Sequence, residues 1–184
     1  MSRNEQVFFH EEQYFRQPWL WAALVLPMAV TAVVVLWQVW SGWPGGKLPA
    51  WTKQLVVTEA VLLAVIFWLY KMRLVTEVRA DELSLHFQWL WRRRAIPFAE
   101  IQSYHVVTYR PVAEYGGWGI RYGAAGDKAY NVSGDRGVRL EFADGGRLLV
   151  GSQRPEELAR ALDVATRADA TPPARTYGWS GEGD

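Results

Sequence analysis

The chain has 184 residues and a formal net charge of +1 at pH 7, which excludes the charge excess typical of nucleic-acid-binding proteins. The absence of cysteine excludes disulfides, thiolate metal ligands and a cysteine nucleophile. The unusual feature is a content of 11 tryptophans, many of them in or beside the apolar N-terminal third. Tryptophan is enriched at membrane–water interfaces, because its ring is apolar and its N–H needs a polar partner.

Residues 1–18 mix aromatic and charged side chains and are expected to lie in the cytoplasm. Val7, Phe8, Tyr14 and Phe15 stand among acidic and basic residues. Two interpretations remain open for this segment: a short helix lying on the membrane surface, or a polar lead-in to a membrane span.

Two apolar runs follow and predict a transmembrane helical hairpin over residues 19–71. Residues 19–40 contain no charged side chain, and about 20 helical residues cross a hydrocarbon core of about 30 Å. The second span is predicted over residues 53–71. Glycines and prolines between the runs break both helices. Pro27 lies inside the first span and is expected to kink it.

The residues that flank the two runs indicate whether the first run is retained and how the hairpin is oriented. The first run is too long for the apolar part of a signal peptide, and acidic residues precede it, so we expect it to be retained. Lys47 and Lys53 are the basic residues of the intervening loop, whereas the other ends carry Arg3, Arg16, Lys71, Arg73 and Arg79. Because cytoplasmic flanks are enriched in these residues, we predict a multi-pass protein of the cell (inner) membrane with both termini in the cytoplasm.

Glu59 is the acidic residue of the second predicted span, where a charged carboxylate is costly. It is either a proton or ion site, or a carboxyl group that hydrogen-bonds to Gln38 or Trp37 of the first span. The second interpretation is favoured, because a proton relay normally needs a second ionisable partner in the membrane and the predicted spans offer none.

Residues 72–168 predict an α+β domain. Alternation of apolar and polar residues predicts about seven short strands, drawn from residues 74–79, 83–91, 94–97, 102–109, 120–122, 129–132, 138–142 and 147–150. A loose helical turn is expected at residues 98–101 and a glycine-rich bend at residues 115–119.

A helix is predicted after the last strand. Pro155 suits its first turn, and Leu158, Ala161, Leu162 and Ala165 recur at helical spacing. The domain should therefore be a curved antiparallel sheet closed by a C-terminal helix. Residues 169–184 are rich in Pro, Gly, Ala and Thr and predict a disordered tail.

Several motifs of this chain resemble the bacterial pleckstrin-homology-like (PH-like) domains that follow a two-span hairpin. The motifs are Pro97-x-x-x-Ile101, Gly117-Trp118-Gly119-Ile120-Arg121, Ala129-Tyr130-Asn131, Gly137-Val138-x-Leu140-x-Phe142-x-Asp144-Gly145, Gly151-Ser152-x-x-Pro155-Glu156-Glu157-Leu158 and the N-terminal Phe9-x-Glu11-x-Gln13-x-Phe15 ahead of Trp19. The resemblance implies a split or partly closed β-barrel with a C-terminal helix, often oligomeric, and implies no known reaction.

The strongest surface candidate is a cluster of aromatic and basic residues, namely Trp89, Trp91, Arg92, Arg93 and Arg94. It is either a basic patch held against anionic lipid or an acidic partner, or a solvated turn between strands. Alternation predicts that one or both tryptophans lie in the core.

Trp118 and Arg121 form the second candidate. Trp118, in its glycine-rich setting, either faces a ligand or plugs the core, and the core position is favoured.

Other familiar chemistries find little support. Phosphoinositides would be repelled by Asp81 and Glu82 in the first strand–strand loop, where such a fold usually binds them. His10, His86 and His105 are too scattered for a metal site. The motifs of nucleotide cofactors are absent, so neither a cofactor nor a metal is expected.

These features together predict a non-enzymatic interaction or scaffold module anchored in the lipid bilayer. A sheet edge or the end of the barrel would bind a peptide, a membrane protein partner or a second copy of the chain. Two alternatives remain: a transport or channel accessory that uses Glu59, and an enzyme with a site in a pocket of the domain.

Overall fold

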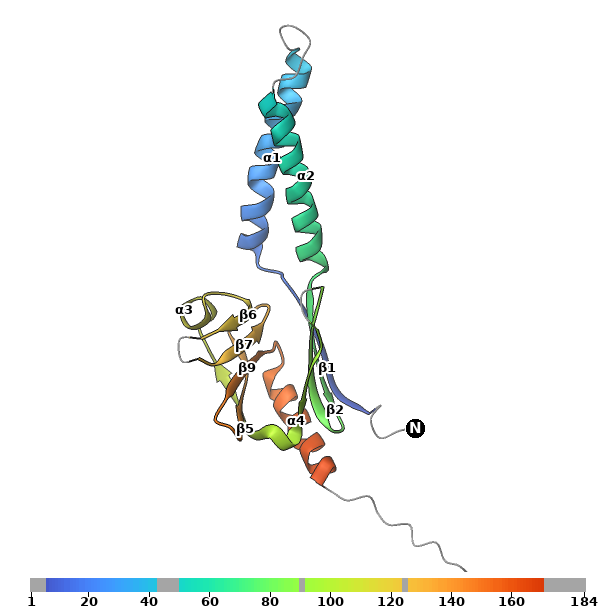
Figure 1. The fold of residues 1–184 in the computed structure, drawn as a ribbon, viewed down its shortest axis with the longest axis vertical. Helices are drawn as coiled ribbons and strands as arrows, with labels where there is room; N and C mark the ends of the chain where they lie inside the picture. The colour runs from blue at the N-terminus through green and yellow to red at the C-terminus, as the bar shows by residue number, and fades with distance from the viewer. Residues whose placement is uncertain (1–5, 43–49, 90–91, 124–125, 171–184) are drawn as a thin grey trace, which may run out of the picture.

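The computed structural model describes residues 6–42, 50–89, 92–123 and 126–170, and shows a helical hairpin that stands on two small β-sheets (Figure 1). The hairpin consists of α1 (Pro18–Ser41) and α2 (Ala50–Lys71). The other elements are β1 (Val7–Tyr14), β2 (Arg73–Arg79), β3 (Glu82–Gln88), β4 (Arg94–Pro97), η2 (Phe98–Glu100), β5 (Ile101–Thr108), α3 (Pro111–Tyr115), β6 (Gly119–Tyr122), β7 (Lys128–Asn131), β8 (Arg136–Phe142), β9 (Arg147–Gly151) and α4 (Pro155–Ala170). The predicted order of apolar helices, sheet domain and C-terminal helix is confirmed, whereas the predicted disordered tail lies almost entirely outside the described residues.

Both helices of the hairpin are long and apolar enough to cross a membrane. Their less exposed side chains recur at alternating spacings of three and four residues, which is typical of a two-helix coiled coil. These residues are Leu24, Met28, Thr31, Val35 and Gln38 on α1, and Thr52, Leu55, Glu59, Leu62 and Ile66 on α2. The other sides remain uncovered: Val33 and Leu36, for example, are 65% and 67% exposed. α1 continues through Pro27 as one helix.

The first sheet has the strand order β1-β2-β3-β4, and its neighbouring strands pair antiparallel. Strand β1 corrects the expectation for the N-terminal segment, which is neither an interfacial helix nor a polar lead-in. Phe9, Glu11 and Gln13 of β1 point inward and are buried. Because two of these three inward residues are polar, the alternation of a strand was hidden in the sequence.

The second sheet has the order β5-β8-β9-β7-β6, in which β7 and β9 run parallel and the other pairs antiparallel. The described residues thus form nine strands in two sheets, where the sequence predicted about seven strands in one curved antiparallel sheet. The helical turn η2 connects the two sheets, as expected at this position. The short helix α3 was not predicted; Gly116, with φ +70°, ends it in the left-handed conformation that glycine adopts easily.

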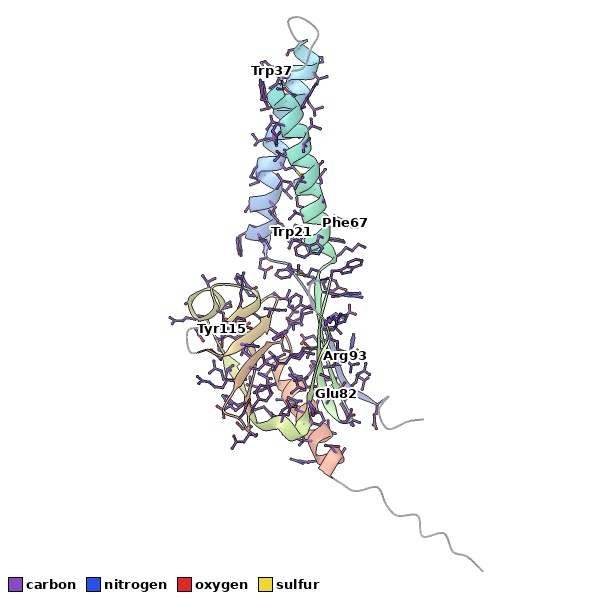
Figure 2. The ribbon with its side chains drawn as sticks, in the orientation of Figure 1. Trp21, Trp37, Phe67, Glu82, Arg93 and Tyr115 are labelled. Atoms are coloured by element: carbon purple, nitrogen blue, oxygen red, sulfur yellow. The ribbon has the colours of Figure 1, made fainter. Side chains whose placement is uncertain are left out.

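Helix α4 packs against both sheets, contacting β1 and β2 of the first sheet and β5 and β8 of the second. Its residues Leu158, Ala161, Leu162 and Ala165 are buried, as their helical spacing predicted. They join one hydrophobic core with inward side chains of both sheets, and Figure 2 shows that side chains fill the space between the sheets. The two sheets and α4 therefore form one packed unit beneath the hairpin.

Candidate interaction site at the hairpin–sheet junction

The hairpin is joined to the first sheet by two short connections. Met72, which is 3% exposed, is the single residue between α2 and β2. On the other side, three residues separate β1 from α1, and the side-chain amide of one of them, Gln17, donates to the carbonyl of Val132 beside the second sheet. Since Tyr14 of β1 pairs with Arg73 of β2, the two helices continue a two-stranded ribbon. This arrangement restricts movement of the hairpin relative to the sheets.

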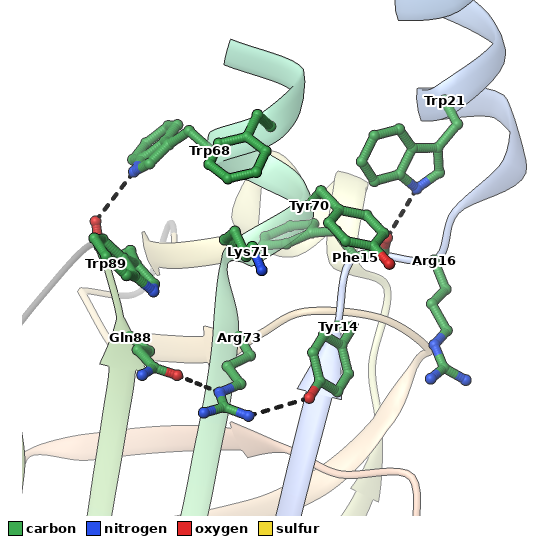
Figure 3. Close-up of a pocket in the computed structure, with 11 residues that line it drawn as sticks. Tyr14, Phe15, Arg16, Trp21, Trp68, Tyr70, Lys71, Arg73, Gln88 and Trp89 are labelled. Atoms are coloured by element: carbon green, nitrogen blue, oxygen red, sulfur yellow. Dashed lines mark hydrogen bonds between the residues drawn. The ribbon is translucent and has the colours of Figure 1, made fainter. Parts of the chain in front are cut away.

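A groove of about 1010 Å³ opens at this junction (Figure 3). We call it the junction groove. Its lining consists of seven aromatic residues, three cationic residues and one amide: Tyr14, Phe15, Trp21, Phe67, Trp68, Tyr70 and Trp89; Arg16, Lys71 and Arg73; and Gln88. The lining includes no carboxylate, so the groove offers aromatic surface and positive charge.

Two tryptophans attach the ends of the helices to the first sheet. Trp68 Nε1 of α2 donates to the carbonyl oxygen of Trp89 at 3.2 Å, and Trp21 Nε1 of α1 donates to that of Phe15 at 2.8 Å. The rings of Trp21 and Tyr70 meet edge to face, with centroids 6.4 Å apart. Because each indole N–H has a backbone partner, the orientation of both tryptophan rings at the groove is fixed.

Trp89 has an unusual backbone for a bulky residue. Its φ is +68°, in the left-handed region, and its side chain is 67% exposed. Such a conformation is strained for residues with a Cβ and persists where the surroundings hold it. The strand ends at Gln88 instead of continuing, so the expectation of a core position is wrong for Trp89. Trp91 lies outside the described residues.

The three cations of the groove have different partners. Arg73 Nη1 donates to Glu12 Oε2 at 2.8 Å and to the Tyr14 hydroxyl at 3.2 Å. The hydrogen bond from Tyr14 and the charge of Arg73 hold the pKa of the Glu12 carboxyl below its usual value. Arg16 lies 5.6 Å from the centre of the Tyr14 ring, and Lys71 lies 5.6 Å from that of Phe67. Within the described part of the chain, neither Arg16 nor Lys71 forms an ion pair with a carboxylate.

The structure does not gather the predicted arginine cluster into one patch. Arg92 is exposed. Arg93 donates to Ser84 Oγ at 2.6 Å and pairs with Glu82, whereas Arg94 is half-buried and lies 6.0 Å from the centre of the Tyr130 ring. The cations that line the groove come instead from the ends of the helices and strands.

Trp118 lies at a contact between the second sheet and the hairpin. Its ring is half-buried, with its centroid 6.1 Å from that of Trp19 in the first turn of α1, so it does not plug the core. Its Nε1 donates to the carbonyl of Gly134 at 3.0 Å. Arg121 Nε donates to the carbonyl of Trp118 at 3.1 Å, which places this second pair of candidates near the hairpin as well.

Two polar pairs lie in the seam of the hairpin. Glu59 is hydrogen-bonded to Thr31, and Thr52 Oγ1 donates to Gln38 Oε1 at 3.3 Å. The predicted partners of Glu59 were therefore wrong: Gln38 belongs to the other pair, and Trp37 points outward with 63% exposure. The antiparallel register places residue 31, rather than residue 38, opposite Glu59.

Most residues of the junction groove were not singled out from the sequence. Arg16, Lys71 and Arg73 entered only as charges that orient the hairpin. The available signal was the combination of aromatic and basic residues at the sheet-side ends of both apolar runs.

No protein-family model matches this chain, and neither does any curated protein. Within the described residues, no group of three or more His, Asp or Glu side chains is placed to hold a metal ion.

Proposed function

We propose that this protein is a non-catalytic interaction module that its helical hairpin holds at the cytoplasmic face of the cell membrane. The proposal rests on how the hairpin is connected to the sheets: its two apolar helices continue through short connections into the paired strands β1 and β2. The most apolar stretches of α1 and α2 are 0% and 6% buried, unlike the core helix of a soluble protein. Lipid would cover the exposed apolar sides of both helices, while the sheets stay beside the bilayer.

The positions of the tryptophans support a spanning hairpin. Trp37 and Trp40 are 63% and 86% exposed at the far end of α1, and Trp21 lies at its sheet-side end. Trp21 and Trp37 are about 24 Å apart at about 1.5 Å per residue, close to the thickness of a hydrocarbon core of about 30 Å. Two belts of interfacial rings are expected at this separation. Basic residues on the sheet side support a cytoplasmic domain.

The edge of β5 is the surface best suited to a partner. Edge strands of soluble domains are usually protected by charge or proline, because their outer backbone groups can pair with another chain. The sheets have the edge strands β1, β4, β5 and β6, and of these only β5 contains no Lys, Arg, Asp, Glu or Pro. Seven of its eight residues pair with β8 on one side, and Val106 is 36% exposed. An extended partner segment could add to this edge as a further strand.

The resemblance to PH-like domains agrees with this proposal. Two sheets closed by a C-terminal helix are compatible with such a fold. Phosphoinositide binding at the first strand–strand loop is not proposed, because Arg79 beside that loop is paired with Glu77 and the loop itself carries Asp81 and Glu82. The alternative role of Glu59 in ion or proton transport has less support, since its partner in the seam is the neutral Thr31.

The proposal is tested by photo-crosslinking in native membranes. A photoreactive residue at position 105 of β5 should give an adduct of one discrete mass, either with a partner or with a second copy of the chain. Val106→Lys should abolish the adduct, because a charge at the edge opposes strand addition. The matched control is Val7→Lys on β1, an edge strand of the other sheet, where the valine side chain is 46% exposed.

Two results would contradict the proposal. The first is a chain that leaves the membrane fraction in an alkaline wash, which would show that the hairpin does not anchor it in the bilayer. The second is an anchored chain that gives no adduct at position 105 and remains a monomer in mild detergent, which would contradict the role as an interaction module.

A further inference from the structure

We infer that the junction groove binds the phosphate of an anionic glycerophospholipid from the surrounding leaflet. The inference rests on the proposed membrane position of the hairpin and adds a ligand site to it. The site differs from the first strand–strand loop, where the sequence disfavours a phosphorylated head group.

The charge of the groove selects for an anion. Arg16, Lys71 and Arg73 line it, and no carboxylate does. Glu12, adjacent to the lining, neutralises Arg73 through their 2.8 Å ion pair. Arg16 and Lys71 keep their charge available, because in the described chain their close contacts are with aromatic rings rather than carboxylates. Two available cations complement a single phosphodiester.

The depth of the groove matches the level of phospholipid head groups. Trp21 and Trp68 belong to the sheet-side belt of aromatic rings, which lies at the membrane–water interface. Lys71 is the last residue of α2, and Arg16 precedes the first residue of α1 by two positions, so both cations lie where the helices leave the hydrocarbon. Cations at this level attract anionic lipids without entering the apolar core.

The surroundings of the groove favour a lipid over a free phosphate ion. Phe67 is 63% exposed, and Leu63, one turn of α2 farther from the sheets, is 53% exposed. An apolar strip thus leads from the groove along the outside of the hairpin. Acyl chains can lie on that strip while the phosphate meets Lys71, whereas a free phosphate would leave the strip unused.

Trp89 gives an independent indication that this place is built for binding. An exposed ring held on a left-handed backbone contributes little to the core and strains the chain. Strained residues of this kind cluster at ligand sites. Figure 3 shows Trp89 and Trp68 at one side of the groove and Trp21 and Tyr70 at the other, with Lys71 between the two pairs and Arg73 beside Tyr14 at the level of the strands.

Native mass spectrometry of the full chain in mild detergent tests the inference. The chain is titrated with phosphatidylglycerol and with phosphatidylcholine of the same acyl chains. We expect one phosphatidylglycerol per chain, bound more tightly than phosphatidylcholine. The double variant Arg16→Gln/Lys71→Gln should lower the affinity for phosphatidylglycerol about 25-fold, at about fivefold for each interfacial charge. Arg16→Lys/Lys71→Arg should preserve it, which keeps the test valid if the neutral variant folds poorly.

The matched control is Arg147→Gln/Arg160→Gln, which removes two exposed cations that do not line the groove. It should change the affinity less than twofold. Equal affinities for the two lipids, or an equal loss in the control, would overturn the inference. Inorganic phosphate that raises the Tm as much as phosphatidylglycerol at the same concentration would also overturn it, in favour of a soluble ligand. A chain that resists the alkaline wash but shows equal lipid affinities disproves the lipid site alone and leaves the proposed function standing.

Discussion

Glu11 of β1 and Ser152, in the short connection between β9 and α4, are joined by a hydrogen bond of 2.6 Å between buried side chains that lie 141 residues apart in the chain. The other carboxylate oxygen of Glu11 accepts the backbone N–H of Gln153 at 2.9 Å. Glu11, which precedes the hairpin and is 5% exposed, thus binds the segment that leads into α4. This contact attaches β1, and through it α1, to the rest of the domain.

Loss of the Glu11 carboxylate should therefore destabilise the domain. Glu11→Ala leaves the buried Ser152 hydroxyl and the partly buried Gln153 N–H without their acceptor, and hydrogen bonds to a charged group are worth about 1.5–3 kcal/mol. We expect the free energy of unfolding to fall by about 2 kcal/mol, measured by circular dichroism in detergent. Glu157→Ala is the matched control, because its carboxylate is 55% exposed and pairs with Arg154 at the surface. An equal effect of the two substitutions would contradict a special role of Glu11.

The polar seam of the hairpin leads to a second prediction. Glu59→Gln keeps a polar partner for Thr31 and removes the acid. Hydrogen bonds between membrane helices average about 0.6 kcal/mol, so insertion and Tm should stay close to those of the parent. Neither the parent nor the variant should conduct protons in liposomes. A proton flux in the parent that disappears in Glu59→Gln would establish the transport alternative.

The sequence was informative where one short segment determines its own structure. The uncharged run before the first loop predicts α1, and the spacing of Leu158, Ala161, Leu162 and Ala165 predicts the buried face of α4. The helical turn at Phe98 is local as well. In each case neighbouring residues carry the whole signal.

The remaining features depend on distant pairing. Strand β1 forms against β2 about 60 residues later, and its inward Glu11 and Gln13 are satisfied by groups near Gly151 and Ser152. No local pattern contains those partners. The junction groove has the same origin, since β1, β2, β3 and both helices each supply a part of its wall. The alternation that suggested a buried Trp89 fails because β3 ends at Gln88 and Trp89 adopts a left-handed backbone conformation.

The strain at Trp89 can be measured by comparing two substitutions. Trp89→Gly and Trp89→Ala both remove a ring that is 67% exposed, but only glycine adopts φ +68° without a steric penalty. We expect the glycine variant to be more stable than the alanine variant by about 1 kcal/mol in thermal unfolding. This order is the reverse of the one usual for surface positions. An alanine variant of equal or greater stability would show that the backbone is not strained there.

Tyr115 should give the domain a measurable sensitivity to alkaline pH. Burial and the hydrogen bond that its hydroxyl donates to Asp127 at 2.6 Å raise the pKa of Tyr115 to about 12, against an ordinary value of 10.0. A raised pKa means that the folded state favours the neutral phenol. The resulting stability is complete below pH 10 and is lost as the pH rises from about 10 to about 12.

Tyr115→Phe removes this contribution, so its loss of Tm between pH 9 and pH 11.5 should be smaller than that of the parent (~2 °C is a measurable difference for a domain of this size). At pH 8 the variant should be the less stable protein, because it lacks the hydrogen bond to Asp127. The two curves should therefore converge as the pH rises. Tyr122→Phe serves as the control, since it removes a hydroxyl from a residue that is 67% exposed and should follow the parent throughout. Parallel curves for Tyr115→Phe and the parent would show that the Tyr115 phenol does not couple to folding in this range.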